Sequence, residues 1–314
     1  MAKSKNASKH SGFLNVYKPS GMTAHDVVGR VRRITGIRQV GHAGTLDPMA
    51  TGVLPIAIGK SCRLLRFLQD DKVYRAGILF GQSTDTDDIE GKVVFTSELM
   101  PSLGQIEEAL PSFIGRISQR PPAYSAIHVD GERLYKLARK GELPAEIPLR
   151  QVTVYSIEQL GFTNSVLELR IHCSTGTYIR SIARDLGEKL GTVACLCSLE
   201  RERAGGFAVE ASAELEKLAE ADAFVQRLIA PETKIDLPLL ELESDEYRRL
   251  GFGQIVSLNL SRVQNLGANE SNPEEKFCKV MFASKLVAIC KLMVQTANEC
   301  SIKPEVVLDD GRSD

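Results

Sequence analysis

Residues 41–48, Gly-His-Ala-Gly-Thr-Leu-Asp-Pro, place a single carboxylate in a short segment rich in turn-forming residues. Gly41 and Gly44 can adopt positive φ angles and allow close backbone approach. Pro48 lacks an amide donor and restricts Asp47 to extended backbone angles. We therefore expect the direction of the Asp47 side chain to be set before any ligand arrives, as a nucleophile or charge stabiliser requires. The alternative is an ordinary surface turn, because Gly, Asp and Pro are all common turn residues.

The elements on either side of this segment are predicted by hydrophobic periodicity and capping signals. Apolar runs at residues 13–17 and 53–58 predict two strands. Thr23 followed by Asp26 has the spacing of a helix N-cap, and the apolar residues after it predict a helix that ends at Gly36. The Asp47 segment would then follow a short basic helix and lead into an apolar strand.

Further along the chain, two helices are predicted over residues 103–114 and 177–190, and Arg180 lies off the apolar stripe of the second. Further strands are predicted at residues 73–80, 93–95, 152–157, 166–173 and 196–203. A basic, Pro-bounded excursion at about residues 120–150 interrupts the pattern. Such a segment suits phosphate contacts with RNA, and the alternative is an ordinary surface loop with a helix.

The charge of the whole chain is nearly balanced, with a formal net charge of −1, so no global basic excess indicates nucleic-acid binding. Residues 27–75 carry nine basic and three acidic residues. A local basic field around one carboxylate suits an anionic polymer, whereas the alternative is a solvated helix face. Residues 231–314 carry 10 basic and 14 acidic residues, so this part of the chain is acidic.

The seven cysteines form no C-x-x-C motif, which predicts reduced thiols. The acidic turn at residues 85–91 lacks the spacing of an EF-hand loop, and Cys195 and Cys197 lack further ligands nearby, so no metal or other cofactor is expected. No apolar run is long enough for a membrane span. Residues 1–12 are basic without an apolar core, which predicts a disordered tail and a cytoplasmic protein.

Together with the Asp47 segment, four separated blocks resemble the TruB-type pseudouridine synthases. These blocks are residues 15–23 with a Lys-Pro-x-Gly pattern, residues 72–75, residues 81–87 and residues 173–187. Several blocks in one order over about residues 13–205 are far more specific than any single pattern.

The resemblance implies an α+β pseudouridine-synthase fold. Its large mixed, mostly antiparallel sheet would be flanked by helices and followed by a small C-terminal PUA-like β-barrel. Residues 13–230 would form the catalytic domain, with the RNA-gripping insertion at about residues 120–150. Residues 231–314 would form the PUA-like domain, with a helix at residues 244–250 and apolar stretches at residues 255–258, 279–293 and 304–308. The acidity of this domain departs from what an RNA-gripping module needs.

The resemblance also implies roles for individual residues. Asp47 matches the catalytic aspartate, Arg180 the arginine that pairs with it, and Tyr74 the tyrosine that stacks on the target base and can accept the C5 proton. The nearby arginine would favour the ionised carboxylate. Without the resemblance, Arg180 would be an exposed helix charge and Tyr74 a half-buried strand aromatic. The implied substrate-binding residues are Lys18, His42, Arg133, Lys136, Arg139, Tyr178 and Leu199.

The implied reaction is the isomerisation of uridine to pseudouridine at position 55 of the tRNA T-loop. It breaks the N1–C1′ bond and joins C5 to C1′, and it demands no cofactor. The carboxylate could attack the sugar carbon, attack the base, or abstract a ribose proton, and the sequence does not choose among these routes. The target base has to be flipped out of its loop before it can react.

The expected partner is tRNA alone, bound by a monomer without a membrane or a protein partner. The insertion resembles that of the stand-alone bacterial form, and the alternative is a guide-RNA-dependent relative. A non-catalytic tRNA-binding or tRNA-folding protein is a second alternative, against which the joint presence of Asp47, Tyr74 and Arg180 argues. A hydrolase using Ser125, His128 and Asp130 is a third, but these residues are too close in sequence for a usual triad.

Overall fold

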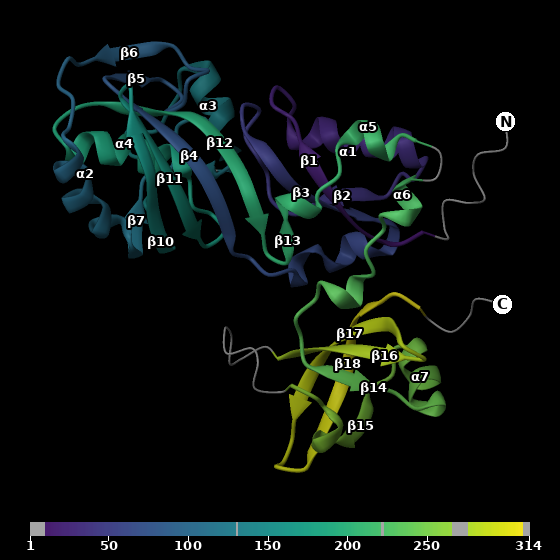
Figure 1. The fold of residues 1–314 in the computed structure, drawn as a ribbon. Coiled ribbons are helices and arrows are strands. Elements are labelled where there is room, and N and C mark those ends of the chain that lie inside the picture. The colour runs from purple at the N-terminus through teal and green to yellow at the C-terminus, as the bar shows by residue number, and fades with distance from the viewer. Residues whose placement is uncertain (1–9, 130, 221–222, 266–275, 310–314) are drawn as a thin grey trace.

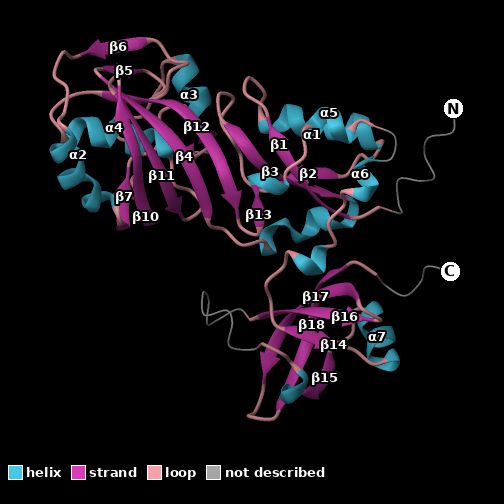
Figure 2. Cartoon of the chain, viewed as in Figure 1, coloured by secondary structure: helices cyan, strands magenta, loops and turns pink. Residues whose placement is uncertain are grey.

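The computed structural model describes residues 10–129, 131–220, 223–265 and 276–309. They form a large sheet with flanking helices and, next to it, a smaller curled sheet (Figures 1 and 2). Most of the expected N-terminal tail, Asp130 and most of the polar loop before residue 276 lie outside the described residues. Within the described ranges, no helix is long and apolar enough to cross a membrane.

The large sheet has the strand order β1-β3-β12-β4-β11-β10-β7, with β2 paired to β3 and β13 paired to β12. The pairing of β3 with β12 is parallel, and the other pairings of these strands are antiparallel. The strands are β1 Gly12–Lys18, β2 Val40–His42, β3 Thr51–Ile58, β4 Lys72–Phe80, β7 Gly115–Gln119, β10 Arg150–Thr163, β11 Val166–Cys173, β12 Ala194–Ala204 and β13 Phe207–Ala208. This arrangement confirms the expected α+β class and the mostly antiparallel sheet.

Smaller elements connect or flank these strands. The helices are α1 Ala24–Thr35, α2 Leu103–Ala109, α3 Leu134–Lys140, α4 Ile179–Lys189, α5 Leu215–Leu218 and α6 Ala223–Gln226. The short hairpins are β5 Gln82–Thr84 with β6 Val93–Thr96, and β8 His128–Val129 with β9 Glu132–Arg133. The 3-10 helices are η1 Gly59–Phe67, η2 Leu110–Phe113 and η3 Val209–Ala211.

The alternation of side chains in β4 explains why one face of the large sheet is covered. Tyr74, Ala76 and Ile78 are buried on that face, whereas Arg75 points to the other face and is exposed. Helix α4 packs on the buried face through Ile182, and α2 adds further apolar contacts to the same core. The start of α4 is thereby held next to the strand that carries Tyr74.

Helix α1 begins and ends where the sequence predicts. The Thr23 side chain accepts a hydrogen bond from Asp26 N, and the Asp26 carboxylate accepts one from Thr23 N, which forms a capping box. Gly36 ends the helix in the left-handed conformation with φ of 71°. The apolar face of α1 packs against β1 and β3 through residues such as Val27 and Val31.

A close backbone contact joins β3 to β12. Thr51 pairs with Glu200, and Gly52 pairs with Arg201. Gly52 has φ of 100°, and a Cβ atom at this position would lie 2.3 Å from the carbonyl oxygen of Arg201. A glycine is therefore required at the point where the chain enters β3 from the Asp47 loop.

The smaller sheet has the strand order β14-β16-β17-β18-β15 and confirms the expected PUA-like unit. Its elements are η4 Pro231–Thr233, β14 Leu239–Glu241, α7 Ser244–Gly251, β15 Val256–Asn259, η5 Leu260–Arg262, β16 Phe277–Phe282, β17 Lys285–Val294 and β18 Glu299–Val307. The apolar stretch expected at residues 279–293 is divided between two strands. The chain reverses at Ala283 and Ser284, which have φ of 48° and 61°.

The two sheets share one apolar cluster. Phe13, Leu64 and Phe207 on the large-sheet side pack in the same buried cluster as Met281 and Ile289 of the small sheet. Polar contacts from η1 add to it, because Lys60 Nζ donates to Leu308 O and Arg63 Nη1 donates to Val307 O, at 2.6 and 2.9 Å. The small sheet is thus packed against the large one.

We expect Phe207→Ala to lower the free energy of unfolding by about 3 kcal/mol, because truncating a buried phenylalanine leaves a cavity. Phe207 is 2% exposed and contacts Phe13 edge to face at 5.9 Å. Denaturant unfolding measures the change, and Phe95→Ala is the matched control, since Phe95 is 61% exposed. A loss no larger than that of the control would contradict the shared core.

Candidate active site

Asp47 lies in the loop between β2 and β3, and main-chain hydrogen bonds fix this loop. Ala43 N donates to Pro55 O at 2.9 Å, and Ala50 N donates to Asp47 O at 3.1 Å. The loop turns at Gly44, which has φ of 83°, whereas Gly41 belongs to β2. Of the two glycines, Gly44 is the one that supplies the positive φ.

Two fully buried cations hold the loop through its carbonyl groups. Lys18 Nζ donates to three carbonyl oxygens, one of which belongs to Pro48, next to Asp47, at 3.0 Å. Arg201 Nη2 donates to Gly44 O at 3.2 Å. Burial lowers the pKa of Lys18 to about 8. Because Lys18 is fully buried, its contacts in this structure orient the loop and leave no surface for a substrate.

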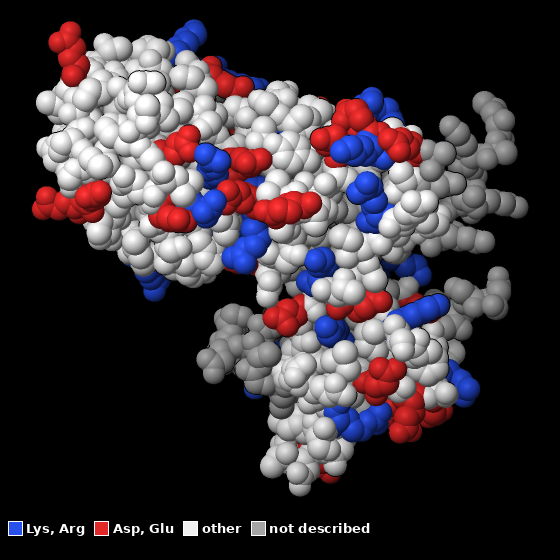
Figure 3. Space-filling model, in the orientation of Figure 1, with Lys and Arg blue, Asp and Glu red and all other residues white. Residues whose placement is uncertain are grey.

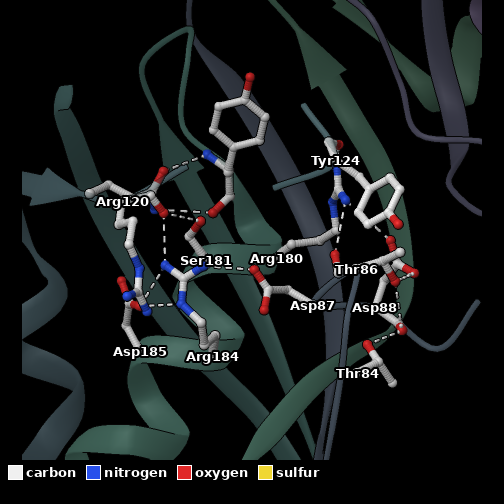
Figure 4. A network of polar contacts seen from close by, with 12 residues as sticks. Thr84, Thr86, Asp87, Asp88, Arg120, Tyr124, Arg180, Ser181, Arg184 and Asp185 are labelled. Atoms are coloured by element: carbon white, nitrogen blue, oxygen red, sulfur yellow. Dashed lines mark hydrogen bonds and ion pairs between the residues drawn. The ribbon is translucent and has the colours of Figure 1, made fainter. Parts of the chain in front are cut away.

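Arg180 joins Asp47 to the rest of the site. Its Nη2 donates to Asp47 Oδ1 at 3.1 Å, and its Nε lies 3.0 Å from Oδ2. The same guanidinium lies 3.4 Å from Asp88 Oδ2 and donates to Thr86 O and Tyr124 O at 3.0 and 3.1 Å (Figure 4). One buried arginine thus contacts two carboxylates and the start of the insertion.

The environment of Asp47 raises the pKa of its carboxyl group. Burial raises the pKa of Asp47, and the negative charge of Asp88 acts in the same direction. Arg180 and Lys18 lower it, as an opposite charge should, but their effect is smaller than that of burial. The Asp47 side chain is 30% exposed, so the carboxylate remains reachable.

A cavity of about 250 Å³ lies in front of this carboxylate. It brings together five of the residues expected at the site, namely Asp47, Tyr74, Tyr178, Arg180 and Leu199. The wall is completed by residues 44–46, Lys72, residues 124–126, residues 175–177 and Ile179. The loop, β4, β12, the start of α4 and the start of the insertion therefore meet at one cavity.

Tyr74 reaches the cavity from β4, where it lies opposite Arg201 of β12. It is 6% exposed, and burial raises the pKa of its phenol, while the neighbouring Arg201 lowers it. The phenol is therefore protonated at neutral pH. To accept a proton, it would have to pass its own proton on.

His42 is placed differently from the other expected residues. It pairs with Ile56 in the β2–β3 ladder, and it is not among the described residues that line the cavity. Its Nδ1 atom is buried without a hydrogen-bond partner in the described part of the chain, and burial lowers its pKa. A neutral imidazole next to the Asp47 loop is the result.

The insertion carries its basic residues on the surface. Arg133, Lys136 and Arg139 are all exposed on β9 and α3. The insertion is tied to the cavity wall because Tyr135 N donates to Ser125 O at 3.0 Å. Any ligand bound by these three cations would therefore lie on an element connected to the cavity.

The basic field expected at residues 27–75 is partly used inside the protein. Lys60 and Arg63 bind carbonyl groups of the small sheet, and Arg66 pairs with Glu305. On the face shown in Figure 3, basic and acidic residues are interspersed over both sheets. A count of basic residues in the sequence could not distinguish cations that bind the chain itself from cations that face solvent.

The Ser125, His128 and Asp130 arrangement has no support in the described residues. Ser125 is 4% exposed, and its Oγ atom has no hydrogen-bond partner among them. His128 is exposed in the β8–β9 hairpin, where it pairs with Arg133, and Asp130 is not described. Ser125 and His128 are therefore not joined as a nucleophile and its base.

Two buried polar residues of the site were not predicted. One is Arg201, described above. It lies in a strand in which buried and exposed residues alternate, so the sequence did not show that its side chain points into the protein. Gln119 is 1% exposed, accepts a hydrogen bond from Tyr178 N at 2.8 Å and donates one to Tyr178 O at 3.0 Å. It thereby holds the start of α4 to β7. A glutamine just before a Pro-rich segment gave no local signal of this long-range contact.

Comparisons with known proteins find relatives of this chain in one family. A family model described as TruB family pseudouridylate synthase (N terminal domain) matches residues 32–179. A protein of Acaryochloris marina named tRNA pseudouridine synthase B is 51% identical, covering 77% of this chain and 86% of the relative. A protein of Caulobacter vibrioides with the same name is 40% identical, covering 95% and 97%.

Solved structures share the fold. One described as a Cbf5-Nop10-Gar1 complex aligns with a TM-score of 0.72 at 24% identity, covering 94% of this chain and 84% of that chain. Another, described as an H/ACA RNP bound to a substrate RNA containing 2'-deoxyuridine, has a TM-score of 0.71 at 24% identity, covering 95% and 85%. The two-sheet architecture is thus shared at low sequence identity.

Proposed function

The chain belongs to the TruB family of pseudouridylate synthases, and from this membership we propose that it isomerises uridine 55 in the T-loop of tRNA without a guide RNA. The names of the curated relatives support tRNA as the substrate. The position within tRNA rests on the resemblance of the blocks around Asp47. The observation that carries the proposal is the cavity that Asp47, Arg180 and Tyr74 share.

In the proposed mechanism, Asp47 acts on the nucleoside as the N1–C1′ bond breaks. Arg180 contacts both oxygens of the carboxylate, Oδ1 through Nη2 and Oδ2 through Nε. These contacts fix the orientation of the carboxylate toward the substrate. The uracil turns, C5 bonds to C1′, and the C5 proton leaves while N1 gains a proton. Tyr74 is proposed to accept the C5 proton while its own phenol proton passes through solvent to N1, and Arg201 favours the phenolate that forms in this exchange.

The target uridine has to leave the loop stack to reach this cavity. We propose that Tyr74 and Tyr178 flank the flipped base and that Leu199 forms an apolar wall, since all three line the cavity. His42 would contact nucleotides next to the target, from its position in β2. Lys18 would act indirectly, by holding the loop through Pro48 O.

The proposed domain division assigns residues 13–230 to catalysis, with the insertion at about residues 120–150, and residues 231–314 to the PUA-like domain. A cytoplasmic monomer that needs no protein partner is part of the same proposal. A guide-dependent enzyme and a non-catalytic tRNA-binding protein are the competing functions.

The function is tested by incubating the purified protein with an unmodified tRNA transcript and no other RNA. Nucleoside-resolved detection should find one pseudouridine, and primer extension after chemical derivatisation should place it at position 55. A transcript with cytidine at position 55 is the matched control and should yield none. Conversion that appears after a second RNA is added would favour the guide-dependent alternative, and binding without conversion would favour the non-catalytic one.

Binding should weaken with salt through contacts between the insertion and phosphates. Changing Arg133, Lys136 and Arg139 together to Gln should flatten the slope of log K against log salt by up to about three units, if each meets one phosphate. Fluorescence anisotropy with tRNA at several salt concentrations measures this slope. Changing Arg248, Lys285 and Lys303, three exposed cations of the acidic small-sheet unit, to Gln is the control and should leave it nearly unchanged. An equal effect of both triple changes would contradict a gripping role for the insertion.

A further inference from the structure

Arg184 lies one helical turn after Arg180 and makes a second set of ion pairs that the reaction scheme does not use. We propose that the Arg184–Asp87 ion pair has a positioning role. It fixes both the acidic turn beside Arg180 and the start of the insertion relative to helix α4. It would thereby hold Arg180 against Asp47 and the insertion in its RNA-binding position. The inference rests on the proposed function and adds two positioning residues to it.

The contacts of Arg184 are numerous for a residue outside the cavity. Its side chain is 12% exposed, and Nη1 lies 2.7 Å from Asp87 Oδ2. Nη2 lies 2.8 Å from Asp185 Oδ1 and donates to Arg120 O at 2.7 Å. Figure 4 shows Arg184 between the two carboxylates and the Arg120 main chain. Few side chains other than arginine can donate in three directions at once.

The acidic turn that Asp87 occupies is the same turn that contacts Arg180. Asp87 holds Arg184, while the adjacent Thr86 O and Asp88 Oδ2 contact Arg180. Thr86 Oγ1 also donates to Asp88 Oδ1 at 2.7 Å. Asp87 is bonded directly to both Thr86 and Asp88. A shift of the Asp87 main chain would therefore move the two groups that orient Arg180.

Asp87 is also held in a backbone conformation that few residues other than glycine adopt. Its φ of 61° lies in the left-handed region, which costs free energy for a residue other than glycine. The ion pair to Arg184 can hold Asp87 in this conformation, because the Asp87 side chain is 16% exposed and its carboxylate faces the guanidinium. Removing either partner frees the turn to relax, and removing Arg184 also leaves the mostly buried Asp87 charge without its partner.

The start of the insertion is held by the same helix. Arg184 Nη2 and Ser181 Oγ both donate to Arg120 O, at 2.7 and 2.8 Å. Four residues later, Tyr124 O accepts from Arg180 Nη2 at 3.1 Å. The segment between these two points precedes the basic α3. Arg184 thus contributes to both the position of the catalytic arginine and the position of the RNA-binding helix.

The test compares wild-type protein with Arg184→Gln, Asp87→Asn and the double variant on whole unmodified tRNA. We expect each variant to lose at least about tenfold in kcat, since displacing a reacting group by about 1 Å can cost about a hundredfold. The double variant should lie within about twofold of Arg184→Gln alone, because that single variant has already lost the ion pair between the two residues. Arg184→Lys should regain kcat through the charge pair. Its KM should remain above that of wild type, because a lysine cannot also reach Asp185 and Arg120 O.

The control is Arg170→Gln, which removes an arginine that also contacts two carboxylates, Glu158 and Glu202, but is 42% exposed. It should stay within about twofold of wild type. If Arg184→Gln does not fold, Asp87→Asn carries the test, since it preserves shape. Variants with a lowered Tm but wild-type kcat and KM below that temperature would overturn the inference. A wild-type protein inactive on the transcript would instead count against the proposed substrate.

Discussion

Asp47→Asn should abolish pseudouridine formation while tRNA affinity stays within about tenfold of wild type. The amide keeps the size and the hydrogen bond from Arg180 Nη2, but it cannot act as a nucleophile or base, so we expect a loss on the order of 10³-fold or more. Affinity should persist because phosphate contacts outside the cavity supply most of it. Single-turnover conversion with enzyme in excess over tRNA and anisotropy titration measure the two quantities separately.

The control for this change is Asp70→Asn, an exposed aspartate that does not line the described cavity. It should leave both rate and affinity near wild type. Protein expressed in cells that lack an endogenous enzyme of this activity excludes contamination. Turnover by such a preparation of the Asp47→Asn variant, beyond trace deamidation, would remove Asp47 from its proposed role.

Tyr74→Phe should still bind tRNA and place the flipped base, but it should stall before product is released. The ring that flanks the base is kept, and the hydroxyl that would accept the C5 proton is lost. General acid–base groups contribute about 10²- to 10⁴-fold, so a loss in kcat of this size is expected with little change in KM. Release of label from substrate tritiated at C5 follows this step directly.

Tyr155→Phe is the matched control, because Tyr155 is 50% exposed on β10 and does not line the described cavity. Its rate should equal that of wild type within about twofold. A wild-type rate for the Tyr74→Phe variant as well would restrict Tyr74 to stacking and packing. Loss of tRNA binding in Tyr74→Phe would show instead that the buried hydroxyl is needed to shape the cavity.

Elements with local signals could be predicted from the sequence. The capping pair of Thr23 and Asp26 and the terminating Gly36 define α1 without any tertiary contact. Strands β1 and β3 are also correct in place, because their apolar runs are bounded by Gly, Pro and polar residues, whereas the three-residue β2 directly before the Asp47 loop was not predicted. The turn at Ala283 and Ser284 was missed because these residues seldom adopt positive φ, so no turn signal is present.

The site itself depends on contacts between residues far apart in the chain. The cavity forms where Tyr74 of β4 and Leu199 of β12 lie on neighbouring strands, and that register is set by the sheet as a whole. The resemblance named Arg180 and Tyr74, but residue patterns alone could not show that Arg180 also contacts Asp88. The direction of Lys18 into the protein was likewise invisible, since most lysines are exposed.

The close approach at Gly52 has a consequence for mutational scanning of this enzyme. No side chain fits there, because even a Cβ atom would lie 2.3 Å from the Arg201 carbonyl oxygen. Every single-nucleotide missense change of its codon would therefore disturb the seam that carries the Asp47 loop. A screen that scores activity alone would rank Gly52 with Asp47, the proposed nucleophile, although no side chain of Gly52 could take part in the chemistry. Measuring protein abundance beside activity would separate the two classes, since loss-of-function changes at Asp47 should leave abundance intact.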